Sequence, residues 1–403
     1  MTASLPDAEW RHRPGLDGLL DALDAGAGKA RFVGGAVRDA LLDLPVNDID
    51  IATTLDPHDV LDRLQKAGIK AVPTGIDHGT ITAVLPGGPV EITTLRRDVS
   101  TDGRRATIAY TDDWREDAAR RDFTINALYA DPLTGAISDY FGGVDDLEAR
   151  RLRFIGDAAT RIAEDHLRIL RYFRFLARYG GNVLDEAAYA ASVAAANSLM
   201  ALSRERIADE LLKLLGVAAP VPALRLMIDG AILTPVLPEI DRAGIDRLES
   251  LMAREAEAGV APAPIRRLAA LLPPDPVLAD QIGARLKLSN KARKRLMTAL
   301  EPASGPESPR ALAYRVGTES AIDRLLLDSA QPLDALAQLN GWSPPHLPIG
   351  GGALIARGLA AGPDVAKALQ AVERAWVAEN FPDDARVAAI ADQIVSKFQR
   401  ARQ

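Results

Sequence analysis

The stretch "FVGGAVRDALLDLPVNDIDIAT", residues 32–53, decides the expected fold because it joins a paired glycine turn to two closely spaced aspartates. Its start, "RFVGG", is typical of a buried strand that ends in a turn, and "AVRDALLD" is typical of the first turns of a helix. This order leaves free backbone N–H groups and the positive end of a helix dipole beside the glycines, which suits a phosphate group. Arg38 can add a charge-assisted contact to the same anion. Without further context, an ordinary strand-to-helix connection explains the turn as well.

The end of the same stretch, "NDIDIAT", places Asp48 and Asp50 two residues apart. In a strand, such residues point to one face, while Ile49 and Ile51 enter the core. Adjacent carboxylates repel each other, and Mg²⁺ held together with a nucleoside triphosphate is the usual cation that relieves the repulsion. A solvated pair on an exposed face is the alternative. Glu91, in the probable strand "VEITTLR", supplies a third acid, although a lone strand glutamate is usually solvated.

The composition is that of a globular protein with several domains. The chain has 403 residues, of which 48% are hydrophobic, and globular domains commonly have ~100 to 200 residues. It has no cysteine, which excludes disulfides and thiolate metal sites and fits a reducing compartment. We expect a cytoplasmic protein, because no run approaches the ~18 apolar residues of a membrane span and the N-terminus lacks an apolar signal. The net charge of -7 argues mildly against nucleic acid as a partner, unless basic residues cluster locally.

Residue patterns divide the chain into a mixed head and a helical remainder. From about residue 31 to 153, short β-branched runs such as "TITAVL" alternate with turn signals such as "PGG", which predicts mixed α/β structure. Beyond about residue 159, stretches rich in Ala, Leu and Arg have helical spacing. We therefore expect an N-terminal extension over 1–30, a head over 31–153, a helical neck over 154–216, and a helical body and tail over 217–403.

The segment "REDAARRDFTINALYAD", residues 115–131, carries adjacent arginines that suit a nucleotide. The guanidinium groups of Arg120 and Arg121 match triphosphate oxygens, and the amide of Asn126 matches a ribose hydroxyl. Solvated arginines and a capping asparagine would give the same pattern.

The segment "AEDHLRILRYFRFLARYGG", residues 163–181, predicts one helix that ends at its glycine pair. Asp165, Arg168, Arg171 and Arg174 recur every three residues, so on one helix they would form a single polar stripe. A surface stripe of ion pairs is the alternative.

Together these segments resemble the nucleotidyltransferase superfamily, and in particular the class II tRNA nucleotidyltransferases, or CCA-adding enzymes, with the related bacterial poly(A) polymerases. The resemblance rests on "GGAVRD", "DID", "TGIDHGTITAV", "VEITTLR", "RRDFTINALY" and "EDHLRILRYFRF", in this order. It covers residues 31–181 strongly, whereas the C-terminal half resembles the family mainly in composition. It implies an α+β nucleotidyltransferase head, a small mixed sheet with helices, followed by an all-α neck, body and tail.

The resemblance also implies a role for each motif residue. Carried over by position, it assigns Gly35 and Arg38 to the nucleotide triphosphate, Asp48 and Asp50 to magnesium, Glu91 to the third carboxylate, Arg121 to the incoming nucleotide, and Asp165, Arg168, Arg171 and Arg174 to the nucleotide-reading helix. The implied reaction adds CMP, CMP and AMP, from CTP and ATP, to the 3' end of tRNA with Mg²⁺ as cofactor.

Selection of C and A without a template has a physical explanation in the nucleotide-reading helix. Cytosine and adenine present an exocyclic amino donor beside a ring-nitrogen acceptor, whereas uracil and guanine present the reverse pattern. The Asp165 carboxylate as acceptor and the Arg168 guanidinium as donor match the first pattern and leave unpaired groups against the second. The polar segment 96–114 resembles the family's flexible loop, associated with the switch from C to A addition, and an ordinary surface hairpin is the alternative.

Several functions remain compatible with these motifs. Full CCA addition to tRNA is the main hypothesis, and a poly(A) polymerase or an enzyme that adds only CC or only A is the closest alternative. A catalytically silent RNA-binding protein is disfavoured, because it has no use for the three acids. For RNA contact, "ARLKLSNKARKRL", residues 284–296, offers six basic residues and no acid, with Ser289 or Asn290 as a helix cap. A solvated helix face explains that segment equally well, and the sequence leaves the oligomeric state open.

Overall fold

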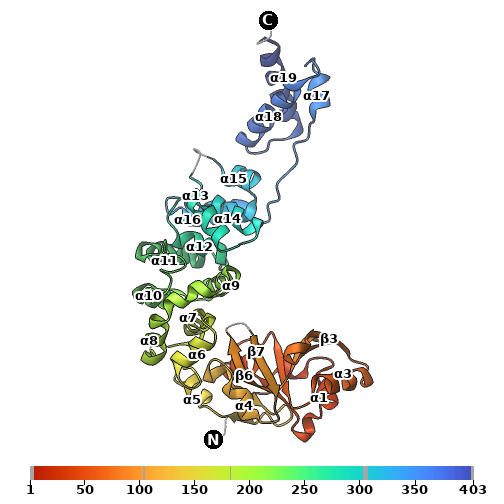
Figure 1. The fold of residues 1–403 in the computed structure, drawn as a ribbon. Helices are drawn as coiled ribbons and strands as arrows, with labels where there is room; N and C mark the ends of the chain where they lie inside the picture. Colours follow the sequence, from red (N-terminus) through yellow and green to blue (C-terminus); the bar gives the residue numbers. More distant parts are fainter. Residues whose placement is uncertain (1–3, 103–104, 182, 303–306, 401–403) are drawn as a thin grey trace. The chain divides into compact units, whose positions relative to one another are not determined.

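The structure, a computed structural model, describes residues 4–102, 105–181, 183–302 and 307–400 (Figure 1). The chain divides into two compact units, Met1–Pro238 and Glu239–Gln403. The strands of the described chain lie in the first unit, and the second unit is built from helices. The expected α+β head followed by an all-helical remainder is therefore confirmed, while the finer domain boundaries stay predictions.

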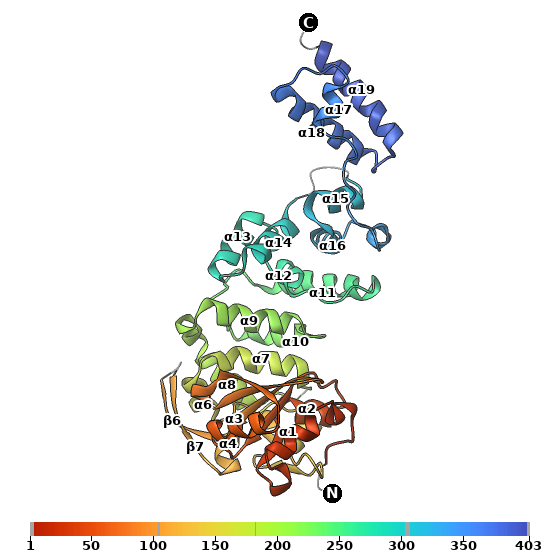
Figure 2. The same ribbon diagram turned by 90° about the vertical axis from the view of Figure 1, so that its right-hand side faces the viewer.

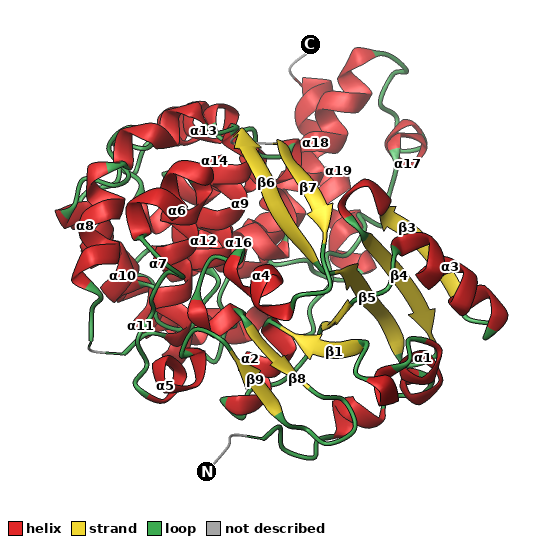
Figure 3. Cartoon of the chain, turned by 60° about the horizontal axis from the view of Figure 1, so that its bottom comes forward, coloured by secondary structure: helices red, strands yellow, loops and turns green. Residues whose placement is uncertain are grey.

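A seven-stranded mixed sheet forms the framework of the head (Figure 3). The strands are β1 (Ala30–Val33), β2 (Ile49–Thr53), β3 (Lys70–Gly75), β4 (Thr80–Leu85), β5 (Gly88–Thr94), β8 (Leu128–Ala130) and β9 (Ile137–Asp139), and a separate two-stranded hairpin consists of β6 (Arg96–Asp102) and β7 (Arg105–Tyr110). The order in the main sheet is β3-β4-β5-β2-β1-β8-β9. Strands β2 and β5 pair in parallel, and the other neighbours are antiparallel.

The stretch that decides the fold lies in the middle of this sheet. After β1, the glycine turn leads into helix α2 (Gly35–Leu41), and β2 then pairs antiparallel to β1. Ile49 and Ile51 of β2 are 1% and 0% exposed, so the alternation along the strand directs Asp50 to the opposite face. Strand β5 alternates in the same way around Glu91, between two buried apolar residues.

Helices surround the sheet and continue the first unit beyond it. They are α1 (Leu16–Ala22), α2 (Gly35–Leu41), α3 (Pro57–Lys66), α4 (Trp114–Ala119), α5 (Gly143–Glu148), α6 (Ala158–Glu164), α7 (Leu167–Tyr179), α8 (Glu186–Ala194), α9 (Arg204–Leu215) and α10 (Val221–Asp229). The segment ahead of β1 packs onto the head, with the Trp10 ring 4.9 Å from that of Phe32 and with Leu16 and Leu19 fully buried. Helices α7 and α9 lie side by side (Figure 2).

The sequence prediction of a single helix over 163–181 is wrong at its start. Helix α6 ends before Asp165 and α7 begins at Leu167, so Asp165 lies in a break between two helices. Its backbone is extended, and its carboxylate accepts the backbone N–H of Leu167 at 3.1 Å, which favours a new helix start over continuation. The three arginines of the predicted stripe all lie on α7, which ends directly before the glycine pair, as predicted.

The segment 96–114, which resembles the flexible loop, contains the β6–β7 hairpin and the start of α4. The hairpin pairs only with itself among the described strands and projects from the main sheet (Figure 3). The backbone N–H of Arg96, its first residue, donates to the carboxylate of Asp117 at 3.2 Å. The hairpin is therefore tied at its base to α4, and its link with nucleotide switching stays a prediction.

The second unit consists of helices held together by apolar and ionic contacts. They are α11 (Arg242–Glu257), α12 (Pro264–Leu271), α13 (Pro276–Arg285), α14 (Asn290–Leu300), α15 (Pro309–Val316), α16 (Thr318–Leu327), α17 (Gly351–Ile355), α18 (Pro363–Ala378) and α19 (Asp384–Arg400). Arg266 of α12 pairs with Glu255 of α11 at 2.7 Å and with Asp323 of α16 at 3.2 Å, all within the core. A separate apolar cluster around Trp376 joins α17, α18 and α19.

The basic segment 284–296 spans the end of α13 and the start of α14, and Ser289, one of the two predicted candidates, caps α14. Its arginines pair with acids of neighbouring elements, namely Arg285 with Glu239, Arg293 with Asp280, and Arg295 with Asp323. These arginines therefore stabilise the packing of the unit, while Lys291 and Lys294 are exposed. RNA contact by this segment stays a prediction.

Candidate active site

Asp50 and Glu91 are neighbours in the middle of the sheet. They occupy the same register position on the parallel strands β2 and β5, so their side chains project from one face. Asp48 directly precedes β2 and is exposed, as is Glu91, whereas Asp50 is half-buried. The predicted acids thus come from two adjacent strands of the sheet and from the residue directly before one of them.

The electrostatics of Asp50 reflect this crowding of negative charge. Burial raises its pKa to about 6, and the charges of Glu91 and Asp48 add to the rise, while Arg121 and Arg38 oppose it. The ionised form of Asp50 is therefore less stable than in water, and positive charge that approaches this face would stabilise it.

The glycine turn brings Arg121 close to the same place. Gly34 precedes α2 with φ 68, a conformation that favours glycine, and a Cβ there would lie 3.4 Å from Nη1 of Arg121. Nη1 of Arg121 also donates to the backbone carbonyl of Asn126 at 3.5 Å. The guanidinium therefore lies against the turn, and its charge is felt at Asp50.

Asp117 of α4 is the residue that holds the paired arginines, and the sequence analysis missed it. Its carboxylate is 1% exposed and pairs with Arg120 at 2.8 Å and with Arg121 at 3.2 Å. It also accepts the hydroxyl of Tyr129 at 2.6 Å and the backbone N–H of Arg96. Burial alone would raise the pKa of Asp117, but Arg121 and Arg120 outweigh it and lower that pKa to about 2. The sequence held a signal, since an acid three and four residues before two arginines on a helix can pair with both.

Arg38 is placed by contacts on three sides. It is 6% exposed, its Nε donates to Asp39 at 2.8 Å, and its Nη1 donates to the Asn126 side-chain oxygen at 2.5 Å. Its guanidinium also lies 4.1 Å from the centre of the Tyr179 ring, near the end of α7. Arg38, the residue predicted to contact the triphosphate, thus also links α2 to α7.

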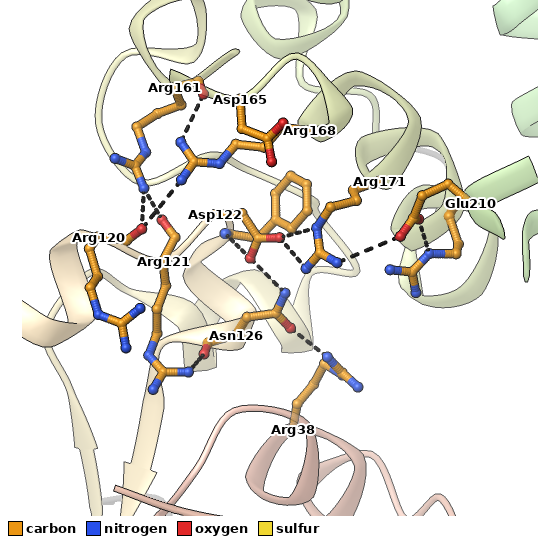
Figure 4. A network of polar contacts seen from close by, with 12 residues as sticks. Arg38, Arg120, Arg121, Asp122, Asn126, Arg161, Asp165, Arg168, Arg171 and Glu210 are labelled. Atoms are coloured by element: carbon orange, nitrogen blue, oxygen red, sulfur yellow. Dashed lines mark hydrogen bonds and ion pairs between the residues drawn. The ribbon is translucent and has the colours of Figure 1, made fainter. Parts of the chain in front are cut away.

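A chain of polar contacts runs from Arg38 to α9 (Figure 4). The amide nitrogen of Asn126 donates to Asp122 at 2.9 Å, and Asp122 accepts from Arg171 at 2.8 and 2.5 Å. Burial would raise the pKa of Asp122, but Arg171 and Asn126 lower it below its usual value. At the far end Glu210 accepts from Arg174 at 2.6 Å and lies 3.8 Å from Arg171, so the sequence-predicted arginines of α7 have carboxylate partners.

Asp165 and Arg168 lie close together at the junction of α6 and α7 (Figure 4). Arg168 pairs with Glu164, and it donates to the backbone carbonyls of Arg161 at 2.8 Å and Arg120 at 3.4 Å. Asp165 pairs with Arg206 of α9 at 2.8 Å. The predicted acceptor and donor are therefore neighbours, and each also contacts at least one group outside the sequence motif.

Comparison with known proteins identifies the family. Residues 30–153 match the model described as the Poly A polymerase head domain, and residues 183–243 match that of the probable RNA and SrmB-binding site of polymerase A. The human CCA tRNA nucleotidyltransferase 1, mitochondrial, is 33% identical to this chain over 93% of the chain and 89% of the relative. The chain belongs to the CCA tRNA nucleotidyltransferase family.

Bacterial members of the CCA tRNA nucleotidyltransferase family are also similar to the chain. The CCA-adding enzyme of Oceanobacillus iheyensis is 39% identical over 52% of each protein. The crystal structure of the Bacillus stearothermophilus CCA-adding enzyme in complex with CTP aligns with a TM-score of 0.70 and 26% identity, over 96% of this chain and 99% of that one. The family resemblance and the fold inferred from the sequence are both confirmed.

The acids of this CCA tRNA nucleotidyltransferase family member suit a hard divalent cation. Across the described residues, no group of three or more acidic or histidine side chains is arranged to hold a metal ion by itself. Mg²⁺ is usually bound by one or two carboxylates together with substrate phosphates and water, so Asp48 and Asp50 provide a suitable donor set. Among the described helices, none combines the length and apolar character that crossing a bilayer requires.

Proposed function

We propose that this chain adds CMP, CMP and AMP, from CTP and ATP, to the 3' end of tRNA without a nucleic-acid template. Family membership supports this activity over poly(A) synthesis, because the relatives that align along most of the chain are named for CCA addition to tRNA. The similarity to a CTP-bound CCA-adding enzyme supports CTP as a substrate. The lack of cysteine fits a reducing compartment, and we propose the cytoplasm.

One observation carries the catalytic part of the proposal, namely the register of Asp50 and Glu91 beside Asp48. In the reaction, the primer 3'-oxygen forms a bond to the α-phosphorus, and the bond between that phosphorus and the pyrophosphate oxygen breaks. A divalent ion, which we propose is Mg²⁺ held by Asp48 and Asp50, would promote loss of the hydroxyl proton and neutralise charge on pyrophosphate. Glu91 adjoins Asp50 and serves as a metal ligand or as the proton acceptor.

The triphosphate is proposed to lie against the glycine turn. Arg121 lies beside Gly34, and Asp117 and Tyr129 hold its guanidinium there, so a phosphate oxygen would meet an oriented cation. Gly35 begins α2, where free backbone N–H groups add donors, and Arg38 in the same helix adds a second positive charge. Placing the triphosphate here would bring its phosphate oxygens close to the acids, so that one divalent cation could bind both.

The base is proposed to contact the junction of α6 and α7. The Asp165 carboxylate accepts the amino group of C or A, and the Arg168 guanidinium donates to the adjacent ring nitrogen. Both side chains are partly exposed, which leaves them accessible to a nucleotide. Arg171 and Arg174 pair with Asp122 and Glu210, so we propose that they act by fixing α7 beneath the base.

The test uses tRNA transcripts that end at the discriminator base, at C and at CC, incubated with Mg²⁺ and with single or mixed nucleotides. We expect products that end in CCA and stop there. Long A tails would instead support a poly(A) polymerase, arrest at CC or addition of A alone would support a partial enzyme, and no product would support a silent RNA-binding protein. Replacing Mg²⁺ with EDTA should abolish incorporation if the proposed metal dependence is correct.

A further inference from the structure

Asp165 lies in a helix break, so regular helical geometry does not fix its carboxylate. Two contacts fix it instead. Oδ1 accepts the backbone N–H of Leu167 at 3.1 Å, and Oδ2 accepts from Nη2 of Arg206 at 2.8 Å. The side chains of Arg206 and Asp165 are 33% and 28% exposed, so this is a half-buried ion pair at the edge of the base site.

The arginine of this ion pair belongs to α9, a helix that lies along α7 (Figure 2). Arg206 and Glu210 are four residues apart on α9 and therefore share one face. Arg206 holds Asp165, while Glu210 holds Arg174 at 2.6 Å. One face of α9 thus contacts both the break and the helix that follows it.

The donor of the proposed base-reading pair is held differently. Arg168 is fixed by Glu164 at the end of α6 and by the backbone carbonyls of Arg161 and Arg120. None of these groups belongs to α9. Loss of Arg206 should therefore release the acceptor Asp165 while the donor Arg168 keeps its partners, which makes the effect of Arg206 on base choice separable.

We propose that Arg206 is a positioning residue that determines specificity, by holding the Asp165 carboxylate in the orientation that accepts from C and A. The proposal rests on the base-reading role of Asp165 given under Proposed function. Each carboxylate oxygen has a second lone pair, so Asp165 can accept a base amino group while it keeps both present contacts. U and G present a carbonyl oxygen in place of this amino group, and that oxygen is a second acceptor that the carboxylate repels. The repulsion disfavours U and G only while Asp165 cannot turn away.

The experiment compares Arg206→Met, Arg206→Lys and Asp165→Ala with the unchanged chain and with Lys213→Gln. Lys213 is a matched control, since it also pairs with an aspartate on α9, at 2.6 Å, but its side chain is 55% exposed. Single-turnover rates against nucleotide concentration are measured for CTP and UTP on tRNA that ends at the discriminator base, and for ATP and GTP on tRNA that ends in CC. Thermal unfolding of each variant checks that it is folded.

For Arg206→Met we expect the preference for CTP over UTP, and for ATP over GTP, to fall by about tenfold to a hundredfold, as for a lost charged hydrogen bond. The loss should appear mainly in the apparent nucleotide affinity. Arg206→Lys should restore part of the preference, because it keeps the charge but not the geometry of the guanidinium. Lys213→Gln should leave the preference unchanged.

Other results would overturn the inference in distinguishable ways. If Arg206→Met slows all four nucleotides by the same factor while Asp165→Ala relaxes base choice, then Arg206 is only structural and the base-reading role of Asp165 stands. If Asp165→Ala itself leaves base choice unchanged, then the proposed base-reading role fails, and the inference fails with it. If Arg206→Met does not fold, an unchanged preference in the folded Arg206→Lys variant would overturn the inference.

Discussion

The carboxylates of the sheet and the arginines of α7 differ in the charges that surround them. Burial and, after it, acidic neighbours raise the pKa of Asp50 to about 6, so this face is short of positive charge. On α7, by contrast, Arg171 pairs with Asp122 and Arg174 with Glu210, so these cations are already neutralised. The difference supports the proposal that the first region receives ligand and metal, whereas the ion pairs of the second region form a preformed framework. Substitutions should therefore affect chemistry in the first region, and stability or base choice in the second.

The largest effect is expected at Asp50. Asp50→Asn should lower single-turnover incorporation of CTP and ATP alike by about a thousandfold, which corresponds to ~4 kcal/mol of transition-state stabilisation. The same variant should be as stable as the unchanged chain or more stable, because it removes a half-buried charge close to Glu91 and Asp48. Urea denaturation measures the stability. A large loss of stability, or activity within tenfold of normal, would contradict the contrast between the regions.

The next effect is expected at Asp117, which belongs to the framework although it lies beside the catalytic face. Asp117→Asn leaves Arg120 and Arg121 without their buried counter-charge, so the free energy of unfolding should fall by about 3 kcal/mol. Tyr129→Phe removes one hydrogen bond to the same carboxylate and should cost only about 1 kcal/mol. Equal small losses for the two variants in urea denaturation would show that the carboxylate charge of Asp117 does not stabilise the fold.

A smaller effect is expected from acid. The pKa of Asp117 falls from 3.8 to about 2 in the folded chain, because Arg121 and Arg120 outweigh its burial. A lowered folded pKa means that the ionised form stabilises the fold above about pH 4, and that roughly 2 kcal/mol of this stability is lost as the pH falls toward 2. The stability difference between the unchanged chain and Asp117→Asn should therefore shrink between pH 5 and pH 3. A constant difference over this range would contradict the assignment.

The same contrast explains how much the sequence could predict. The glycine turn, the strand alternation and the acids Asp48, Asp50 and Glu91 follow from local spacing, which is why the head and its catalytic candidates could be inferred from short motifs. The framework depends on distant partners: Arg171 and Asp122 are 49 residues apart, and Arg206 and Asp165 are 41 apart. Residue spacing carries no information on such pairs, so Asp122, Glu210 and Arg206 were missed.

The helix break at Asp165 was missed for a related reason. Spacing by threes suggested one continuous stripe, and helical propensity gave no sign that the aspartate side chain would accept the backbone N–H of Leu167 instead. Asp165 lies outside α7, where the neighbouring helix α9 can orient it. This placement supports a role for Asp165 that is separate from that of the α7 arginines.

The central claim is that the acids of the sheet perform the chemistry while the α6–α7 junction chooses the base. It is tested most directly by single-turnover incorporation of all four nucleotides by Glu91→Gln and Asp165→Ala, on tRNA that ends in CC. We predict that Glu91→Gln slows ATP and GTP by the same factor, and that Asp165→Ala reduces the preference for ATP over GTP at least tenfold, as when a buried polar mismatch is removed. A changed preference in Glu91→Gln, or an unchanged one in Asp165→Ala, would contradict this division of roles.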